Sequence, residues 1–291
     1  MTRAYKVVDV FTRQPLYGNP VAVVLDSHGL DTQAMQRIAQ WTNLFETTFV
    51  LPPTQAGADY RLRIFSPRGE LPFAGHPTLG TAYAVLEAGL ASSRNGILVQ
   101  ECKVGLIELR LEHAGSGSRL TLNIPPAVVT PLTERDADNL EEVIRSKLDR
   151  TVAPALVNVG VAWVVAQLPS VDALLSLKPD YSNSAELERR LGATGVCLYA
   201  MYPSGNEAAI EVRSFLPSCG VEEDPVCGSG NAGIGAFRFA RGLLPRDGAS
   251  YVASQGRCVG REGRVFVSVS SEGRVGIGGE CMTCVSGELR F

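Results

Sequence analysis

The sequence predicts an α+β protein made of two lobes of similar construction. The chain has 291 residues, which is enough for two domains at about 100–200 residues each. Short runs rich in β-branched and aromatic residues dominate, and few segments show helical spacing of apolar residues. The second half also repeats the motif order of the first. We expect one lobe over residues 1–125 and the other over residues 126–291, with a last strand at 278–291 that can return to the first lobe.

Strands account for most of the first half, where several runs alternate apolar and polar residues. We expect them at Lys6–Phe11, Ala22–Leu25, Thr47–Leu51, Tyr60–Phe65, Gly96–Gln100, Leu106–Glu112 and Arg119–Ile124.

Two helices are expected among these strands. Asp31 is placed to cap a helix in which Met35, Ile38 and Ala39 share one face. A second helix should run from Pro77 to Gly89, since proline suits the first helical turn and glycine the exit. Apolar residues cover most of its circumference, which predicts a helix buried inside its lobe.

The second half begins after a predicted linker at Pro125-Pro126-Ala127 and is expected to follow the same plan. A glycine-rich segment from Gly228 leads into a helix that should end near Gly242. The segment Pro72–Gly80 matches Pro225–Gly233 in its proline and two glycines, at an offset of 153 (225 − 72). Further strands are expected at Ala162–Ala166, Val196–Met201, Ala209–Phe215, Val252–Ser254 and Val265–Val269.

Composition and charge exclude several classes of function. The net charge is −3 and like charges form no long block, which argues against nucleic acid or an anionic membrane as partner. We find no signal-peptide pattern and no bilayer-spanning apolar stretch, so we expect a cytoplasmic protein. Seven scattered cysteines do not suggest a disulfide framework. Cys281 and Cys284 form a C-x-x-C pair, but no second pair or nearby histidine completes a metal site.

Each half places a glycine-bearing loop at the start of its buried helix. Helix N-termini carry free N–H groups and a partial positive charge, so they bind anions. Two such ends, at Gly75 and Gly228, would hold a carboxylate and stabilise negative charge that develops on a deprotonated substrate. Alternatively, these loops are only tight helix entries. Because the loop occurs twice, we favour the functional interpretation.

Several polar side chains lie at these loops. His76 follows Gly75 and is a candidate for substrate contact or proton transfer. Asp224 precedes the second loop, where it could orient an amine or hydroxyl, although three consecutive acids usually form a solvated turn. Ser229 could donate a hydrogen bond to a carboxylate.

Two further residues are candidate acid–base groups. Glu46 lies between a helix end and an apolar strand, where burial would raise its pKa, although position alone favours an exposed hinge glutamate. Cys227 stands at a helix N-terminus, where a thiol can have a lowered pKa and act as a base. The matching residue in the first half is Ala74, so a two-thiol racemase is disfavoured.

Together these motifs resemble the PhzF-like proteins of phenazine biosynthesis. The resemblance covers essentially the whole chain, and its most specific parts are the Phe-Ala-Gly-His-Pro-Thr and Glu-Asp-Pro signatures. It is carried by Asp9-Val10-Phe11-Thr12, Gly18-Asn19-Pro20-Val21-Ala22-Val23, Glu46-Thr47-Thr48-Phe49, Leu71–Gly80, Glu223–Ser229, Gly278-Gly279 and Gly287-Glu288-Leu289.

The resemblance implies a diaminopimelate-epimerase-like fold, in which each lobe wraps a barrel-like mixed sheet around a central helix and the active site lies between the lobes. It implies a cofactor-free and metal-free isomerase of small amino or hydroxy carboxylates such as trans-2,3-dihydro-3-hydroxyanthranilate, and a homodimer. A glutamate moves a proton between two ring carbons, which makes Glu46 the general acid/base and reverses the interpretation from position alone. His76 and Asp224 take catalytic roles, and the residues implied to bind substrate are Gly75, Gly228, Ser229, Asn19 and Cys227.

Two departures from the family pattern leave other functions open. Phe45 replaces a smaller residue before the glutamate, and Cys227 replaces threonine in a loop that resembles those of proline racemases and diaminopimelate epimerase. One alternative is therefore an amino-acid racemase or epimerase with Cys227 as a base. Another is a protein that binds a small ligand without catalysis.

Overall fold

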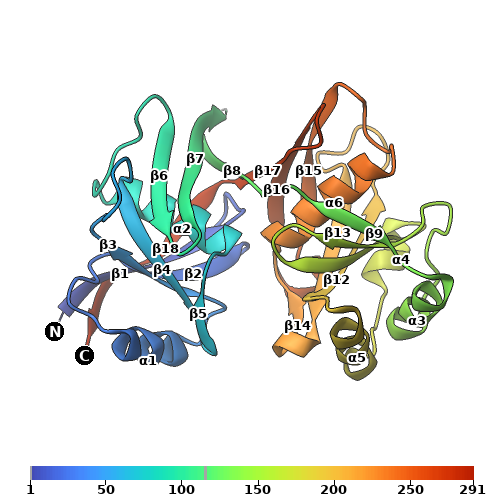
Figure 1. Cartoon of the computed structure of the whole chain (residues 1–291), viewed down its shortest axis with the longest axis horizontal. Helices are drawn as coiled ribbons and strands as arrows, with labels where there is room; N and C mark the ends of the chain where they lie inside the picture. The colour runs from blue at the N-terminus through green and yellow to red at the C-terminus, as the bar shows by residue number, and fades with distance from the viewer. Residues whose placement is uncertain (1, 115–116) are drawn as a thin grey trace. The chain divides into compact units, whose positions relative to one another are not determined.

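The computed structural model describes residues 2–114 and 117–291. The chain divides into two compact units, shown in Figure 1. The first comprises Met1–Leu122 and Gly278–Phe291, and the second comprises Asn123–Ile277. The described residues form a mixed α and β structure with many strands and few helices, as the sequence predicts.

The strands of the first unit pair in mixed directions. The first strand pairs antiparallel with both the second and the last strand of the chain. The second then pairs parallel with the third, and the third antiparallel with the fourth. The fourth pairs antiparallel with the fifth and parallel with the sixth. The bounds are β1 Thr2–Val10, β2 Asn19–Val24, β3 Thr47–Leu51, β4 Tyr60–Ser66, β5 Gly69–Leu71, β6 Ile97–Cys102, β7 Gly105–Ala114, β8 Gly117–Asn123 and β18 Cys281–Arg290.

Two helices accompany these strands. In α1 (Thr32–Thr42), the Asp31 side chain accepts a hydrogen bond from the Ala34 N–H, and the helix buries its predicted apolar face. The second helix, α2 (Gly75–Glu87), is buried along most of its length. A Cβ on Gly80 would lie 2.5 Å from a Val21 methyl carbon, so glycine is what lets this helix pack so closely against β2.

The second unit follows the same succession of pairings around its own buried helix, α6 (Gly228–Ala240). Here β11 pairs parallel with β12, β12 antiparallel with β13, and β13 antiparallel with β14 and parallel with β15. The bounds are β9 Val128–Pro131, β10 Ala155–Asn158, β11 Ala162–Gln167, β12 Gly195–Met201, β13 Ile210–Leu216, β14 Val221–Asp224, β15 Gly248–Gln255, β16 Gly263–Ser270 and β17 Val275–Gly279.

Three helices of the second unit were not expected from the sequence. They are α3 (Glu134–Ile144), α4 (Val171–Leu175) and α5 (Tyr181–Leu191), and they contribute Leu140 and Leu187, among others, to a core shared with β12. The predicted linker, Pro125-Pro126-Ala127, lies between β8 and β9, outside any strand or helix. The strand that follows it, Val128–Pro131, pairs with β10 and was not expected. Its last residue is a proline, which is compatible with pairing at the end of a short strand.

Candidate functional site

The N-terminus of α2 is open to a ligand on its backbone side. Ala74 caps the helix without any side-chain hydrogen bond. A Cβ placed on Gly75 would meet nothing within 4 Å, so a substrate can approach the backbone closely. The helix begins at Gly75, two residues before the predicted start at Pro77. This end of α2 therefore has the properties of an anion-binding helix terminus.

Glu46 reaches this region because the chain turns sharply after α1. Asn43 ends that helix in the left-handed conformation, with φ of 53°. The Glu46 carbonyl then accepts a hydrogen bond from the Ala22 N–H at 3.2 Å, which fixes its backbone beside β2 just before β3 begins. The Glu46 side chain is 15% exposed. It is therefore partly buried rather than the exposed hinge residue that position alone suggested.

His76 and Glu46 face each other within the first unit. The His76 Nε2 atom lies 3.4 Å from Glu46 Oε2, and the histidine side chain is 10% exposed. Burial lowers the pKa of His76 to about 3, so the imidazole is neutral near pH 7. The ring also donates a hydrogen bond to the Pro20 carbonyl. A neutral imidazole has one N–H. Because the ring uses that N–H to donate to the Pro20 carbonyl, its Nε2 atom presents a lone pair toward the carboxyl group.

In the second unit, Asp224 occupies the matching approach to α6. It is the last residue of β14, and its Oδ1 accepts a hydrogen bond from the Val226 N–H at 3.1 Å. Burial raises the pKa of Asp224 to about 6. The three consecutive acids are not one solvated turn: Glu222 is exposed, whereas Glu223 forms an ion pair with Arg213 at 2.7 Å.

Cys227 has a different environment from the reactive thiol considered from the sequence. It caps α6, and its sulfur accepts a hydrogen bond from the Gly230 N–H at 3.3 Å. The residue is 4% exposed, and burial raises the pKa of its thiol well above the usual value. The expectation of a lowered thiol pKa was wrong, because desolvation of the thiolate outweighs the favourable helix terminus.

Ser229 is held by a residue that sequence reasoning missed. The Trp163 indole Nε1–H donates a hydrogen bond to Ser229 Oγ at 3.1 Å.

Gln255 was also missed by the sequence analysis. Its amide oxygen accepts a hydrogen bond from the Cys227 N–H at 3.1 Å, and its amide nitrogen donates to the Asp224 carbonyl at 3.0 Å. Gln255 thereby fixes the loop between β14 and α6. A closer comparison of the two halves could have revealed it, since the first unit has a fully buried Gln100 in β6, the strand matching β15.

The structure thus assembles the predicted residues in two groups, one in each unit. The first contains Glu46, His76 and Gly75, and the second contains Asp224 and the first residues of α6 with their cap: Cys227, Gly228 and Ser229. Asn19 is fully buried as the first residue of β2, where it pairs with Val10 of β1.

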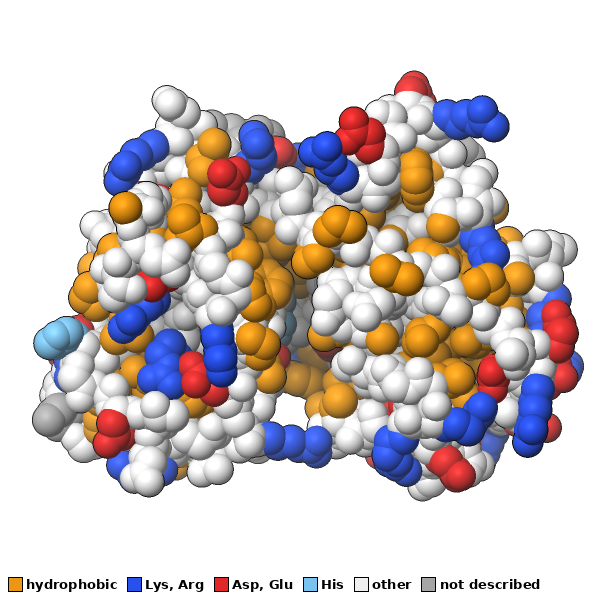
Figure 2. Space-filling model, viewed as in Figure 1, with side chains coloured by type: hydrophobic (Ala, Val, Ile, Leu, Met, Phe, Trp, Pro, Cys, Tyr) orange, Lys and Arg blue, Asp and Glu red, His pale blue; other side chains and the backbone are white. Residues whose placement is uncertain are grey.

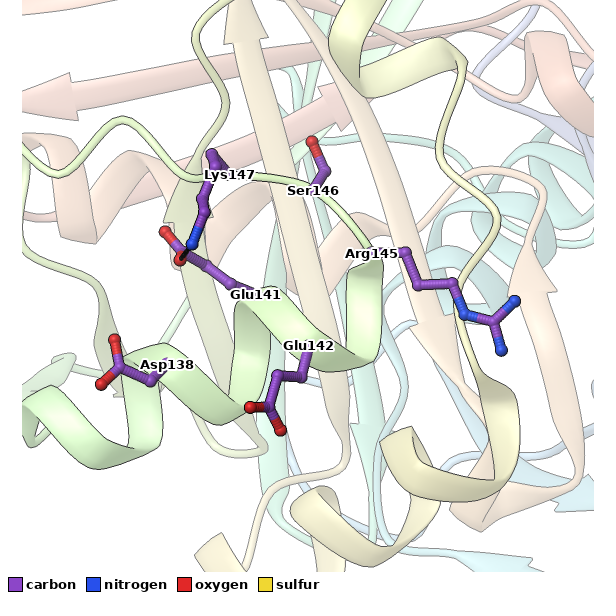
Figure 3. Close-up of a pocket in the computed structure, with 6 residues that line it drawn as sticks. All are labelled: Asp138, Glu141, Glu142, Arg145, Ser146 and Lys147. Atoms are coloured by element: carbon purple, nitrogen blue, oxygen red, sulfur yellow. Dashed lines mark hydrogen bonds and ion pairs between the residues drawn. The ribbon is translucent and has the colours of Figure 1, made fainter.

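An open pocket along α3, shown in Figure 3, is lined by Asp138, Glu141, Glu142, Arg145, Ser146 and Lys147. Its most buried acid, Glu141, already accepts hydrogen bonds from Lys147 and Arg150, and these hold its pKa at about 2. Within residues 2–114 and 117–291, no cluster of three or more metal-ligating side chains is found.

Surface charge agrees with the composition. On the face shown in Figure 2, Lys and Arg side chains are interspersed with Asp and Glu rather than gathered into one basic area. None of the helices that the structure describes combines the length and apolarity needed to cross a membrane.

Comparison with known proteins assigns the chain to a family. A family model described as phenazine biosynthesis-like protein (PhzC-PhzF) matches residues 8–287, nearly the whole chain. The chain belongs to the phenazine biosynthesis-like family. The chain is also similar to a Pseudomonas fluorescens trans-2,3-dihydro-3-hydroxyanthranilate isomerase, to which it is 38% identical over 274 residues covering 93% of this chain and 91% of the relative.

The chain is also similar to a yeast protein and to a solved structure. Antisense-enhancing sequence 1 of Schizosaccharomyces pombe is 36% identical over 293 residues, covering 98% of each protein. The crystal structure of a Bacillus anthracis PhzF-family protein superposes with a TM-score of 0.91 at 25% identity and covers each chain fully. The mixed α and β fold predicted from the sequence is thereby confirmed. With several relatives named as isomerases, this phenazine biosynthesis-like protein is an isomerase.

Proposed function

We propose that this isomerase moves a proton between two carbon atoms of a small amino or hydroxy carboxylate, with trans-2,3-dihydro-3-hydroxyanthranilate as the first substrate to test. Glu46 is the general acid/base, and neither a metal ion nor an organic cofactor takes part. The substrate is suggested by the relatives that carry the name of this reaction. The acid/base assignment comes from the environment of Glu46.

The observation that carries the proposal is the contact between Glu46 and a neutral histidine. The ionised carboxylate removes a proton from the substrate carbon and becomes a carboxylic acid. His76 Nε2, at 3.4 Å with its lone pair toward Glu46 Oε2, then accepts a hydrogen bond from that acid. A protonated histidine at this distance would instead favour the ionised glutamate. The neutral ring therefore lets the glutamate hold the proton and return it to a second carbon.

The groups at the N-terminus of α6 act on the same substrate in this proposal. The α2 and α6 N-termini bind the substrate carboxylate and stabilise negative charge on the deprotonated intermediate. Ser229 donates a hydrogen bond to the substrate. Asp224, whose pKa is raised to about 6, is still mostly ionised near pH 7 and accepts a hydrogen bond from a substrate amine or hydroxyl. Gly75, Gly228, Asn19 and Cys227 line the binding region.

The two compact units are, in this proposal, the two lobes expected from the sequence, each with one buried helix and one ligand-binding helix end. The common succession of strand pairings and the equal lengths of α2 and α6, 13 residues each, support a shared origin. The homodimer and the cytoplasmic location stay predictions.

Steady-state kinetics of three variants test the role of Glu46. In Glu46→Gln the carboxylate base is lost, so we expect kcat to fall by about 10²- to 10⁴-fold, the usual contribution of general acid–base catalysis. Glu87→Gln is the matched control, because Glu87 is the last residue of α2, at the opposite end of that helix from His76, and its carboxylate bonds Lys6 and Thr283. Glu46→Asp keeps a carboxylate but shortens it, and should retain part of the activity.

Full activity of Glu46→Gln would overturn the assignment. In that case Cys227 is the next base to test, although its raised pKa opposes that role. Ligand binding without turnover in the wild type would favour the non-catalytic alternative instead.

A further inference from the structure

We propose that Trp163 is a positioning residue that sets Ser229 as a hydrogen-bond donor toward the substrate. This inference rests on the proposed function, since it assigns Ser229 the task of holding the substrate carboxylate. The chemistry follows from what each group can do. An indole N–H only donates, so Ser229 Oγ must accept at Trp163 and keeps its own proton for another partner.

The indole is held too tightly to turn away. Trp163 is 2% exposed and lies in β11 opposite Gly195 of β12. A Cβ on Gly195 would lie 2.7 Å from Trp163 Cζ3, so the ring occupies the space that a side chain would need there. The opposite end of the ring lies near α6, where a Cβ on Gly233 would lie 3.9 Å from Trp163 Cδ1. Packing at both ends of the ring fixes the direction of the Nε1–H bond.

Among the residues that the structure describes, the proton that Ser229 keeps has only a weak hydrogen-bond partner. Ser229 Oγ lies 3.6 Å from Cys227 Sγ, and a thiol sulfur is a poor acceptor. A carboxylate oxygen is a much stronger acceptor, because charge-assisted hydrogen bonds are about twice as strong as neutral ones. Ser229 can therefore turn its hydroxyl proton from the sulfur to a bound carboxylate while its oxygen still accepts the hydrogen bond from Trp163.

In the first unit the residue that matches Ser229 is His76, and it donates its hydrogen bond where Ser229 accepts one. His76 and Ser229 are each the second residue of their helix. His76 donates to the Pro20 carbonyl in β2 and so offers a lone pair, whereas Ser229 accepts from Trp163 in β11 and so offers a proton. The corresponding strands β2 and β11, each of which pairs parallel with the next strand, thus determine whether the N-terminus of α2 or α6 presents an acceptor or a donor.

Kinetics of Trp163→Phe test the role while keeping an aromatic ring in place. Loss of one neutral hydrogen bond predicts that KM rises about three- to tenfold, with kcat changed less than about twofold, because carboxylate binding helps ground and transition states equally. In a Ser229→Ala background, Trp163→Phe should have no further effect on KM. Trp41→Phe is the matched control, since Trp41 is 75% exposed in α1. An unchanged KM, or an equal rise without Ser229, would overturn the inference.

Nuclear magnetic resonance of the indole N–H groups gives a readout that does not need turnover. The chain has only two tryptophans, so Trp163 and the exposed Trp41 give two indole signals. We expect Ser229→Ala to move the Trp163 signal toward the position of Trp41 while the Trp41 signal stays in place. If the Trp163 signal does not move, the hydrogen bond and the inference both fail. If it moves but wild type shows no turnover of trans-2,3-dihydro-3-hydroxyanthranilate, only the proposed substrate fails.

Discussion

At the scale of single residues, burial raises the pKa of Asp224 and lowers the pKa of His76. The two side chains therefore change the free energy of unfolding with opposite pH dependence. Asp224 has its pKa raised from 3.8 to about 6, so the folded state holds its proton more tightly than the unfolded state. The stability that it contributes is present below pH 3.8 and is lost as the pH rises through about 6. His76 has its pKa lowered from 6.5 to about 3, so its contribution is present above pH 6.5 and is lost as the pH falls.

Urea unfolding of two variants at about pH 5 and pH 7.5 checks these signs. Relative to Asp224→Asn, the wild type should lose about 1–2 kcal/mol of unfolding free energy as the pH rises between these values. Relative to His76→Asn, the wild type should gain a similar amount over the same interval. Differences of the same sign in both pairs would contradict the assigned environments.

The sequence supplied candidate site residues but not the environments that set their protonation states. The motif around Glu46 identified the carboxylate, and the loop before α2 identified His76. The neutral state of His76 depends on burial, which outweighs the opposing effect of the hydrogen bond to the Pro20 carbonyl, and burial involves residues far apart in the chain. The prediction of a lowered pKa for Cys227 was wrong for a similar reason, because the burial that raises its pKa depends on tertiary packing.

At the scale of elements, the N-termini of α2 and α6 differ in how much space their glycines face. Gly75 has open space beside it, whereas a Cβ on Gly230 would lie 2.7 Å from Cys197 Sγ and 3.2 Å from Cys227 Sγ. The first glycine leaves room for a ligand, and the second leaves room for the protein's own side chains. Alanine substitution at each position separates these roles.

We expect Gly230→Ala to lower the unfolding free energy by about 1–3 kcal/mol through overpacking. Gly75→Ala should leave stability unchanged or raise it by up to about 1 kcal/mol, because alanine is the better helix former. Its KM should nevertheless rise, since the methyl group occupies the space proposed for the substrate. Thermal melts and steady-state kinetics of both variants give these quantities. A destabilised Gly75→Ala protein with normal KM would contradict the role assigned to this helix end.

Element prediction succeeded where local signals and packing agreed. The Asp31 cap and the Met35, Ile38 and Ala39 face of α1 were predicted and are confirmed. Helices α3 and α5 were missed although Thr133 and Asp180 cap them through their side chains. Their many polar residues weakened the apolar pattern in the sequence, and their placement depends on the core that they share with β12.

At the scale of the whole molecule, the last strand of the chain pairs with the first. β18 pairs with β1 from Thr2↔Arg290 to Val10↔Cys281, with one irregularity between Val7 and Val8. The first unit therefore depends on residues from both ends of the chain. The sequence predicted a last strand at 278–291 that can return to the first lobe, but its partner strand and register are long-range contacts that no local pattern specifies.

Truncation before residue 281 should therefore unfold the first unit, because β1 loses a partner along its whole length. Limited proteolysis should then cut within residues 2–122, while a fragment close to 123–277 persists. Removal of residues 288–291 alone is the matched control, because it unpairs only three residues at the start of β1 and should be tolerated. Equal resistance of both truncated proteins would contradict this dependence.

The central claim is that Glu46 carries the proton in an isomerisation. Its most direct test is proton nuclear magnetic resonance of trans-2,3-dihydro-3-hydroxyanthranilate in deuterium oxide, with wild type and Glu46→Gln compared at equal concentration. We predict that the substrate signals disappear and product signals grow with the wild type, while Glu46→Gln leaves the spectrum unchanged over the same time. Conversion by Glu46→Gln at the wild-type rate would contradict the claim.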